Sequence, residues 1–229
     1  MRSIRRKLIS LLLVIVALLS LFSLSSCNRR YDEEEVVAAA KVLLKDAELL
    51  NKVYYGSGIK YLDVENSFSK YYRRADSTHL NELGFSTIDE LKALTEKTFS
   101  IGYANNIYSS ILYGLQEEDG TVITPARYYQ HTEEETGESY IMVYTEFKQM
   151  FVDSIVYDYD SIKAEKSKKE NVYLSVNATV TNSQGQSQQV TLTITLIEEV
   201  NGWRICNPTY ANYNALKDRY SELEDKKIK

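Results

Sequence analysis

Apolar and polar side chains alternate through residues 171–206, NVYLSVNATVTNSQGQSQQVTLTITLIEEVNGWRIC. A period of two places one side of a β-strand against a core and leaves the other side in solvent. A polar turn at residues 182–187 separates the two alternating runs, which predicts two half-buried antiparallel strands. Their inward positions are Val172, Leu174, Val176, Ala178, Val180, Val190, Leu192, Ile194 and Leu196.

Further strands flank this pair. Asn201-Gly202 is typical of a type I′ turn, because both central residues of that turn need positive φ, and it predicts a returning strand at residues 203–206. Upstream, residues 122–131 and 140–147 predict a hairpin, and residues 155–164 predict another strand. We therefore expect a curved antiparallel sheet.

Helical periodicity dominates the part of the chain before the strands. Four acidic residues at 32–35 favour a helix start, since the helix dipole stabilises negative charge there. The apolar positions that follow recur at steps of three and four and end before Gly56: Val36, Ala40, Leu43, Ala47, Leu50 and Tyr54. Such a face can pack on the chain's own sheet or on a coiled-coil partner, and the short run favours the sheet.

Two more helices are predicted in the middle of the chain. Thr87 and Glu90 have the spacing of a capping box, which begins a helix over residues 88–99. Ser100 is a candidate cap for a third helix with an apolar face of Ile101, Ala104, Tyr108, Ile111 and Leu115. Residues 59–85 show no strong period and predict loop with short elements. Helices that precede an antiparallel sheet define an α+β fold, completed by a C-terminal amphipathic helix at residues 211–229.

The first 27 residues have the layout of an export signal. Arg2, Arg5, Arg6 and Lys7 precede an apolar run over residues 8–22, which is shorter than the ~20 residues of a membrane-spanning helix. The segment Leu24-Ser25-Ser26-Cys27 resembles the lipobox of bacterial lipoproteins. This resemblance implies cleavage of residues 1–26 and a diacylglycerol on Cys27, with residues 27–31 as a tether. An ordinary signal peptide with an incidental cysteine is the alternative.

Export changes the charge of the chain. Four of the 27 basic residues and none of the 32 acidic residues precede Cys27, so the remainder has 23 basic and 32 acidic residues and a formal charge of −9. An acidic body repels phosphate backbones and anionic headgroups, which argues against nucleic acid as a partner. The membrane contact is then the lipid on Cys27. Cys206 is the one other cysteine, so no disulfide is expected within the exported chain.

The predicted order of elements resembles a known α+β family. Leading helices, a twisted meander and the pattern Asn201-Gly202-Trp203-Arg204-Ile205 before Pro208 resemble the NTF2-like, or cystatin-like, cone over residues 32–210. The family includes enzymes, binding modules and scaffolds, so it implies a fold rather than an activity. A fainter similarity, to inhibitors of cell-wall DL-endopeptidases, runs through Tyr71-Tyr72-Arg73 and residues 91–104.

Few residues are candidates for catalysis. Asp158 and Asp160 share one strand face with Val156 and Ile162, whereas Tyr157 and Tyr159 share the other with Ile155. A catalytic pair of carboxylates needs the side with Asp158 and Asp160 to point inward. We expect the side with Tyr157 and Tyr159 to point inward instead. His131 is expected at a strand end, His79 in an exposed loop, and Cys206 as a packed, unreactive thiol. No cofactor motif or metal-ligand spacing occurs.

Tyrosine is the compositional peculiarity, with 19 residues against 6 phenylalanines. The pairs Tyr54-Tyr55, Tyr71-Tyr72 and Tyr128-Tyr129 place neighbouring rings on opposite sides of a strand or around a helix. Exposed rings suit glycan or protein binding. The alternative is that tyrosine takes the place of phenylalanine as a half-buried residue.

The predicted function is a lipid-anchored, non-catalytic extracytoplasmic module that binds a small ligand, wall component or envelope protein; an endopeptidase inhibitor or an enzyme is the alternative. The predicted ligand-binding residues are Tyr128, Tyr157, Tyr159 and Trp203.

Overall fold

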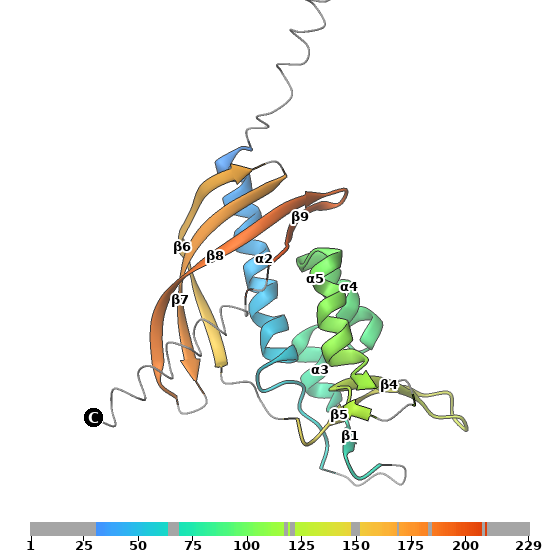
Figure 1. The fold of residues 1–229 in the computed structure, drawn as a ribbon. Helices are drawn as coiled ribbons and strands as arrows, with labels where there is room; N and C mark the ends of the chain where they lie inside the picture. The colour runs from blue at the N-terminus through green and yellow to red at the C-terminus, as the bar shows by residue number, and fades with distance from the viewer. Residues whose placement is uncertain are drawn as a thin grey trace, which may run out of the picture.

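The computed structural model describes residues 31–63, 69–116, 119, 122–147, 152–168, 170–182, 185–207 and 209. Within this part the protein is α+β, as predicted, with helices packed against antiparallel sheets (Figure 1). The predicted signal segment, Cys27 and the C-terminal helix at residues 211–229 lie outside the described residues. No helix in the described part is both long enough and apolar enough to cross a membrane.

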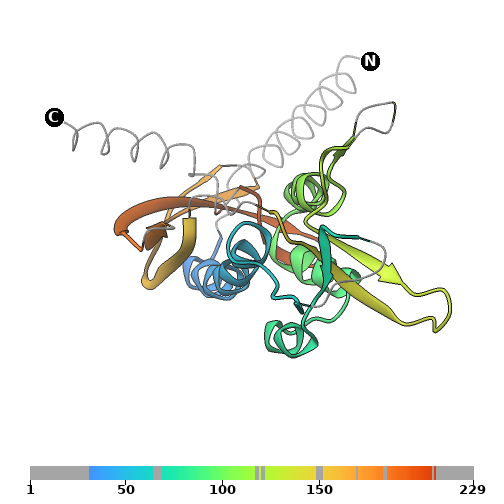
Figure 2. The same cartoon turned by 90° about the horizontal axis from the view of Figure 1, so that it is seen from below.

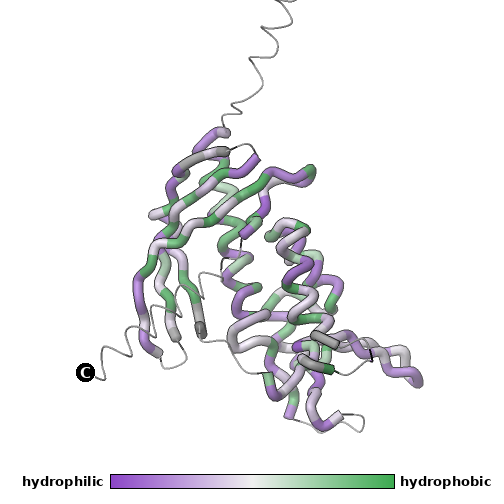
Figure 3. Tube along the Cα trace, in the orientation of Figure 1, coloured by the Kyte–Doolittle hydropathy of each residue, from purple (hydrophilic) through white to green (hydrophobic). Residues whose placement is uncertain are grey.

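A curved four-stranded antiparallel sheet of order β6-β7-β8-β9 forms one side of the molecule. Its strands are β6 (Val152–Lys168), β7 (Asn171–Asn182), β8 (Ser187–Glu199) and β9 (Gly202–Ile205). Val176 pairs with Leu192 and Ala178 with Val190, so apolar side chains face each other across the ladder. The alternation predicted over residues 171–206 is confirmed, and Figure 3 shows hydrophobic residues recurring along these strands.

Helix α2 (Glu33–Tyr54) packs on this sheet, mainly over β6 and β9. Asp32 begins the helix by accepting a hydrogen bond from Glu34 N at 2.9 Å. All six predicted apolar positions are buried, and Leu44 and Val53 widen the buried stripe. Each fully buried leucine contributes about 1.5–3 kcal/mol to stability. The prediction that this face packs on the chain's own sheet is therefore confirmed.

A smaller antiparallel sheet of order β1-β5-β4 lies beyond the C-terminal end of α2 (Figures 1 and 2). It contains β1 (Tyr72–Arg74), β4 (Tyr128–Thr132) and β5 (Ser139–Tyr144). The predicted hairpin is present as β4 and β5. Residues 122–124, expected to continue into β4, instead form β3 (Val122–Thr124), which pairs with β2 (Leu115–Gln116).

Four short helical elements lie between β1 and β2 in the chain: α3 (Ser77–Leu83), α4 (Ile88–Thr98), α5 (Ile101–Ile107) and the π-helical turn η1 (Tyr108–Leu112). The capping box at Thr87 and Glu90 is confirmed. At the start of α5 the predicted side-chain cap is wrong, because Ser100 makes no side-chain capping bond; its backbone N–H instead donates to Ile205 O of β9 at 2.9 Å. Ile101 is also 57% exposed, and Tyr103 takes the inward position.

The predicted faces of β6 hold for its first half only. Ile155 and Tyr157 are buried while Asp158 and Asp160 are exposed, as expected. Ile162, predicted to share the aspartate face, is buried as well, which corrects that assignment. The ladder with β7 shifts register between Asp158 and Lys163, and such an irregularity exchanges the two faces of a strand.

Candidate functional site

Tyr128, the first predicted ligand-binding residue, is fully buried on β4. Its hydroxyl donates to Val53 O at 2.7 Å and accepts from Ile59 N at 3.1 Å. Burial raises the pKa of Tyr128 to about 12, so the hydroxyl is protonated and available as a donor. The contacts within the chain make Tyr128 an anchor for the C-terminal end of α2.

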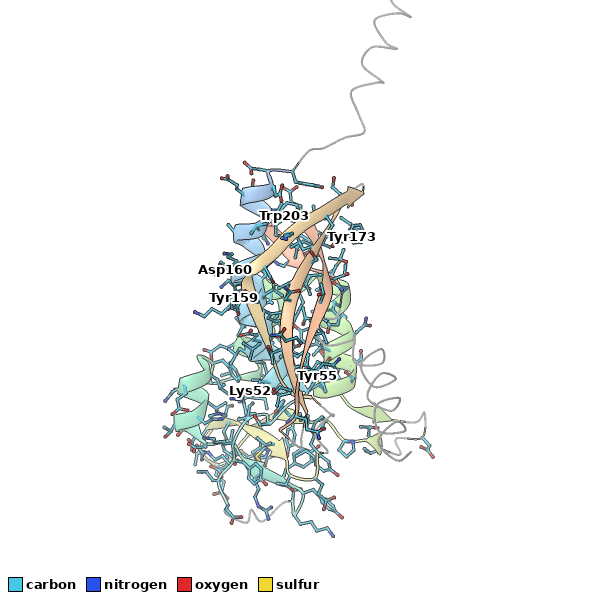
Figure 4. All side chains as sticks on the ribbon, turned by 90° about the vertical axis from the view of Figure 1, so that its left-hand side faces the viewer. Lys52, Tyr55, Tyr159, Asp160, Tyr173 and Trp203 are labelled. Carbon is cyan, nitrogen blue, oxygen red and sulfur yellow. The ribbon has the colours of Figure 1, made fainter. Side chains whose placement is uncertain are left out.

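Of the other three predicted ligand-binding residues, Tyr159 and Trp203 lie near α2 (Figure 4), and Tyr157 N donates to Glu48 Oε1 of α2 at 2.8 Å. Tyr157 is 3% exposed, and its ring is 6.5 Å from that of the half-buried Tyr159. Trp203 donates from Nε1 to Glu35 Oε1 at 3.4 Å and stacks edge-on against Tyr31 at 4.9 Å. The structure therefore does not gather the four residues around one pocket, and their ligand-binding role stays a prediction.

The candidate catalytic carboxylates face solvent. Asp160 Oδ1 lies 3.2 Å from Lys41 Nζ of α2, and its side chain is 96% exposed. Asp158 accepts a hydrogen bond from Asp160 N at 3.2 Å and borders a pocket of about 190 Å³ together with Val156 and Asn177. The prediction that the tyrosines point inward and the aspartates outward is confirmed for this strand.

The remaining candidates from the sequence are the two histidines and Cys206. His79, predicted in an exposed loop, is buried on α3, where its Nδ1 accepts from Lys60 N at 3.0 Å; this corrects the prediction. His131 is half-buried near the end of β4, with its ring 5.3 Å from that of Tyr140. Burial raises the pKa of the half-buried Cys206 thiol, which favours its unreactive, protonated form.

The outer face of the three-stranded sheet is built mainly from tyrosine. Tyr72 pairs with Tyr144, Tyr129 with Met142 and His131 with Tyr140, and directly paired residues share a face. We call this surface the tyrosine face: Tyr72, Tyr129, Tyr140 and Tyr144, with Tyr71 and Tyr113 at its margins. Met142, which shares this side of β5 with Tyr140 and Tyr144, has no exposed surface.

Ring contacts hold the tyrosine face together. The Tyr72 ring meets the Tyr129 ring edge-on at 4.9 Å and lies 5.3 Å from the Tyr144 ring. The Tyr72 hydroxyl donates to Ala126 O at 2.7 Å. Burial, followed by the nearby Tyr129 and Tyr144, raises the pKa of Tyr72 to about 12. Tyr72 is therefore protonated, and these contacts fix the orientation of its ring.

Two open pockets adjoin the tyrosine face. Pocket A, of about 440 Å³, lies between α4, η1 and β4, and its walls include Ile88, Lys92, Tyr113, Tyr129 and Gln130. Pocket B, of about 400 Å³, is lined by residues that include Tyr71, Tyr72, Tyr113, Pro125 and Tyr144. Tyr113 is 58% exposed and contributes to both, so the pockets are neighbours.

Pocket A contains a polar side chain whose NH2 group has no partner within the described residues. Gln130 Oε1 accepts from Ile88 N, the first N–H of α4, at 3.0 Å. This bond fixes the amide orientation, because the backbone donor must face the oxygen. Gln130 Nε2 is buried and has no hydrogen-bond partner within the described part of the chain. A buried donor without a partner costs about 1–3 kcal/mol, which a ligand acceptor can recover.

The three tyrosine pairs are visible in the sequence, and from the pair on β4 the prediction took Tyr128, not Tyr129, as a ligand-binding residue. As predicted, Tyr128 and Tyr129 lie on opposite sides of β4, with Tyr128 inward and Tyr129 half-exposed. A usable signal was the alternation of Tyr140, Met142 and Tyr144 with Ile141 and Val143 on β5, which separates a tyrosine side from an aliphatic one.

No family model matches the chain, and a comparison with curated proteins returned no match. Within the residues that the structure describes, no three His, Cys, Asp or Glu side chains come together as a metal site would require. The geometry of the tyrosine face and its two pockets is therefore what indicates the function.

Proposed function

We propose that the chain is an extracytoplasmic lipoprotein, anchored by a lipid on Cys27, that binds its ligand at the tyrosine face without catalysis. The observation that carries this proposal is a fixed set of half-exposed rings bordered by two pockets. Concave sites lined by aromatic groups and a few polar atoms are the usual form of binding sites. Tyrosine adds hydrogen-bonding capacity to apolar area at a low cost in conformational entropy.

The position of α2 suits an anchored protein. The first described residue, Tyr31, follows Cys27 by four positions and packs against Trp203 near the start of α2. Figure 4 shows Trp203 at this end and Lys52 and Tyr55 at the opposite end, toward the three-stranded sheet. The 22 residues of α2 span about 33 Å at ~1.5 Å per residue. With a lipid on Cys27, α2 would hold the tyrosine face well away from the bilayer.

A binding role accounts for the site better than catalysis does. Burial holds the Tyr72 hydroxyl in its protonated form, and the Asp158 and Asp160 carboxylates lie on the other sheet in solvent. General acid–base catalysis uses a group whose pKa lies near the working pH.

We also propose that α2 and β6–β9 form an NTF2-like cone, which the strong curvature of the sheet around one long helix supports.

Inhibition of a cell-wall DL-endopeptidase is the second candidate. Tyr71 and Tyr72, from the segment that resembles such inhibitors, lie at the tyrosine face. Adding the protein to a DL-endopeptidase assay should then lower the rate, and the Tyr71→Ala variant should inhibit less. An unchanged rate at saturating protein would remove this candidate.

The anchor is tested by labelling cells with a radioactive fatty acid. The wild-type chain should carry label, and globomycin should block the cleavage that follows. Cys27→Ser should carry none, whereas the matched variant Cys206→Ser should be labelled like wild type. An unlabelled, freely released wild-type protein would contradict the anchor.

The site is tested by placing a photo-crosslinking residue at position 113 or position 42 in the full chain. Tyr113 is 58% exposed at the tyrosine face, and Val42 is 57% exposed on α2, so the two positions have matched access. Envelope material should crosslink strongly at position 113 and weakly at position 42. Equal capture at both positions would show that the tyrosine face is not the binding site.

A further inference from the structure

We propose that pockets A and B are adjoining subsites for a neutral glycan that carries N-acetyl groups. The inference rests on the proposed binding function and specifies its ligand. The two pockets have similar volumes, about 440 and 400 Å³, and share Tyr113 as a common wall. Two similar neighbouring subsites suit a ligand made of repeated units, which a glycan is.

The chemistry of the walls fits a sugar ring. A pyranose presents a face of C–H groups that can pack on an aromatic ring, and its hydroxyls hydrogen-bond at the edge. Tyr113 and Tyr129 border pocket A, and Tyr71 and Tyr144 border pocket B, so each subsite has aromatic surface for one such face. Thr87 and Ser139 in pocket A and Thr124 in pocket B add hydroxyl groups.

The charge at the site favours a neutral ligand. Lys70, Arg74 and Lys92 lie over tyrosine rings of the site. They are balanced by Glu138, which pairs with Arg74 at 2.7 Å, by Glu146 near Tyr144, and by Asp89 in pocket A. The exported chain as a whole has a formal charge of −9, so this balance is local to the site. Ligand selection would therefore depend on stacking and hydrogen bonds.

Gln130 supplies the specificity for the N-acetyl group. Its Nε2 donor is buried without a partner within the described structure, while its Oε1 is held by Ile88 N. An acetamido carbonyl is a strong neutral acceptor that ordinary hexoses lack. Because Nε2 is buried, the acceptor reaches it after a side-chain shift at the pocket wall, a common adjustment on binding.

Two oligosaccharides of the same β-1,4 linkage test the proposal on the full chain in detergent micelles by calorimetry. Chitotetraose, made of N-acetylglucosamine, should bind at least about tenfold more tightly than cellotetraose, made of glucose, a difference of about 1.4 kcal/mol. Tyr113→Ala should weaken chitotetraose binding about tenfold or more, whereas Tyr173→Ala, on β7 of the other sheet, should leave it unchanged (Figure 4).

Gln130→Glu isolates the hydrogen bond. A carboxylate still accepts from Ile88 N but cannot donate, so the variant should fold and should lose the preference for chitotetraose. Equal binding of both oligosaccharides by wild type, or unchanged selectivity in Gln130→Glu, would overturn the proposal. Strong crosslinking at position 113 without binding of either oligosaccharide would overturn the glycan while leaving the binding function in place.

Discussion

The Tyr128 hydroxyl on β4 donates a hydrogen bond to the Val53 carbonyl oxygen at 2.7 Å, close to the C-terminal end of α2. The last carbonyls of a helix have no partner within the helix and need one from elsewhere. The preceding residue adds a second bond just after the helix, since Arg127 Nη2 donates to Gly56 O at 2.7 Å. Through these two bonds the three-stranded sheet is fixed to α2, and with it Tyr129 and the tyrosine face.

We expect Tyr128→Phe to lower the free energy of unfolding by about 1–3 kcal/mol, because Val53 O and Ile59 N both lose a buried partner. Urea denaturation measures the change. Tyr129→Phe is the matched control on the same strand and should stay within about 0.5 kcal/mol of wild type. Equal effects of the two variants would show that the bonds to α2 do not stabilise the fold.

Gly58→Ala should destabilise the protein more than Gly84→Ala. Both glycines have positive φ, +74° and +81°, which disfavours alanine by about 1–2 kcal/mol. At Gly58 the added Cβ would also collide with the Arg127 guanidinium and lie 2.5 Å from the Tyr128 hydroxyl, whereas at Gly84 nothing lies within 4 Å. Thermal unfolding should show the larger loss for Gly58→Ala, and a similar loss for both would contradict the close packing.

Thr87→Ala should cost about 1 kcal/mol, because the Thr87 side chain accepts from Glu90 N at 3.1 Å at the start of α4. Ser100→Ala should change stability by less than about 0.5 kcal/mol, since Ser100 lacks a side-chain capping bond at the start of α5. Urea denaturation of the two variants compares them directly. A larger loss of stability in Ser100→Ala than in Thr87→Ala would show that Ser100, and not Thr87, is the more important helix cap.

The same two residues show how far sequence alone could reach. Thr87 could be identified as a cap because its partner Glu90 is three residues away. Ser100 also precedes an apolar helical run, but the residue three positions on is Tyr103, and the position of Ser100 is set by the hydrogen bond from its backbone to Ile205, which is distant in sequence. Periodic segments such as α2 and β7 were predicted correctly because one continuous face determines each of them.

The tyrosine face could not be predicted because it combines the β4–β5 hairpin with β1, which lies much earlier in the chain. β1 has three residues, too few to show a period, and its register against β5 decides that Tyr72 lies beside Tyr144. Likewise, the alternation of β4 separates Tyr128 from Tyr129 but does not say which of them is inward. The packing and pairing of β1, β4 and β5 in the folded chain determine both the register of Tyr72 and which of Tyr128 and Tyr129 points inward.

Because of His79, we expect the folded protein to lose stability in mild acid. Burial, and then the positive charge of Lys60, lowers the pKa of His79 below its usual 6.5, with a smaller contribution of the same sign from Lys52, while Glu82 and Asp76 oppose the shift. The unfolded chain therefore takes up a proton at a higher pH than the folded one. Stability is fully present above about pH 6.5 and falls as the pH drops toward the lower folded value. Protonation of Nδ1 would also remove the acceptor for Lys60 N.

Urea denaturation between pH 7.5 and 5.5 should accordingly show a falling free energy of unfolding for the wild type. His79→Gln cannot take up this proton, so its stability should fall less over the same interval. His131→Gln, which changes the other histidine, should follow the wild-type pH dependence. The interval ends above the range in which exposed carboxylates titrate, so the slope that His79→Gln removes belongs to the imidazole of His79. Parallel pH profiles for wild type and His79→Gln would show that the fold tolerates a charged imidazole at this position.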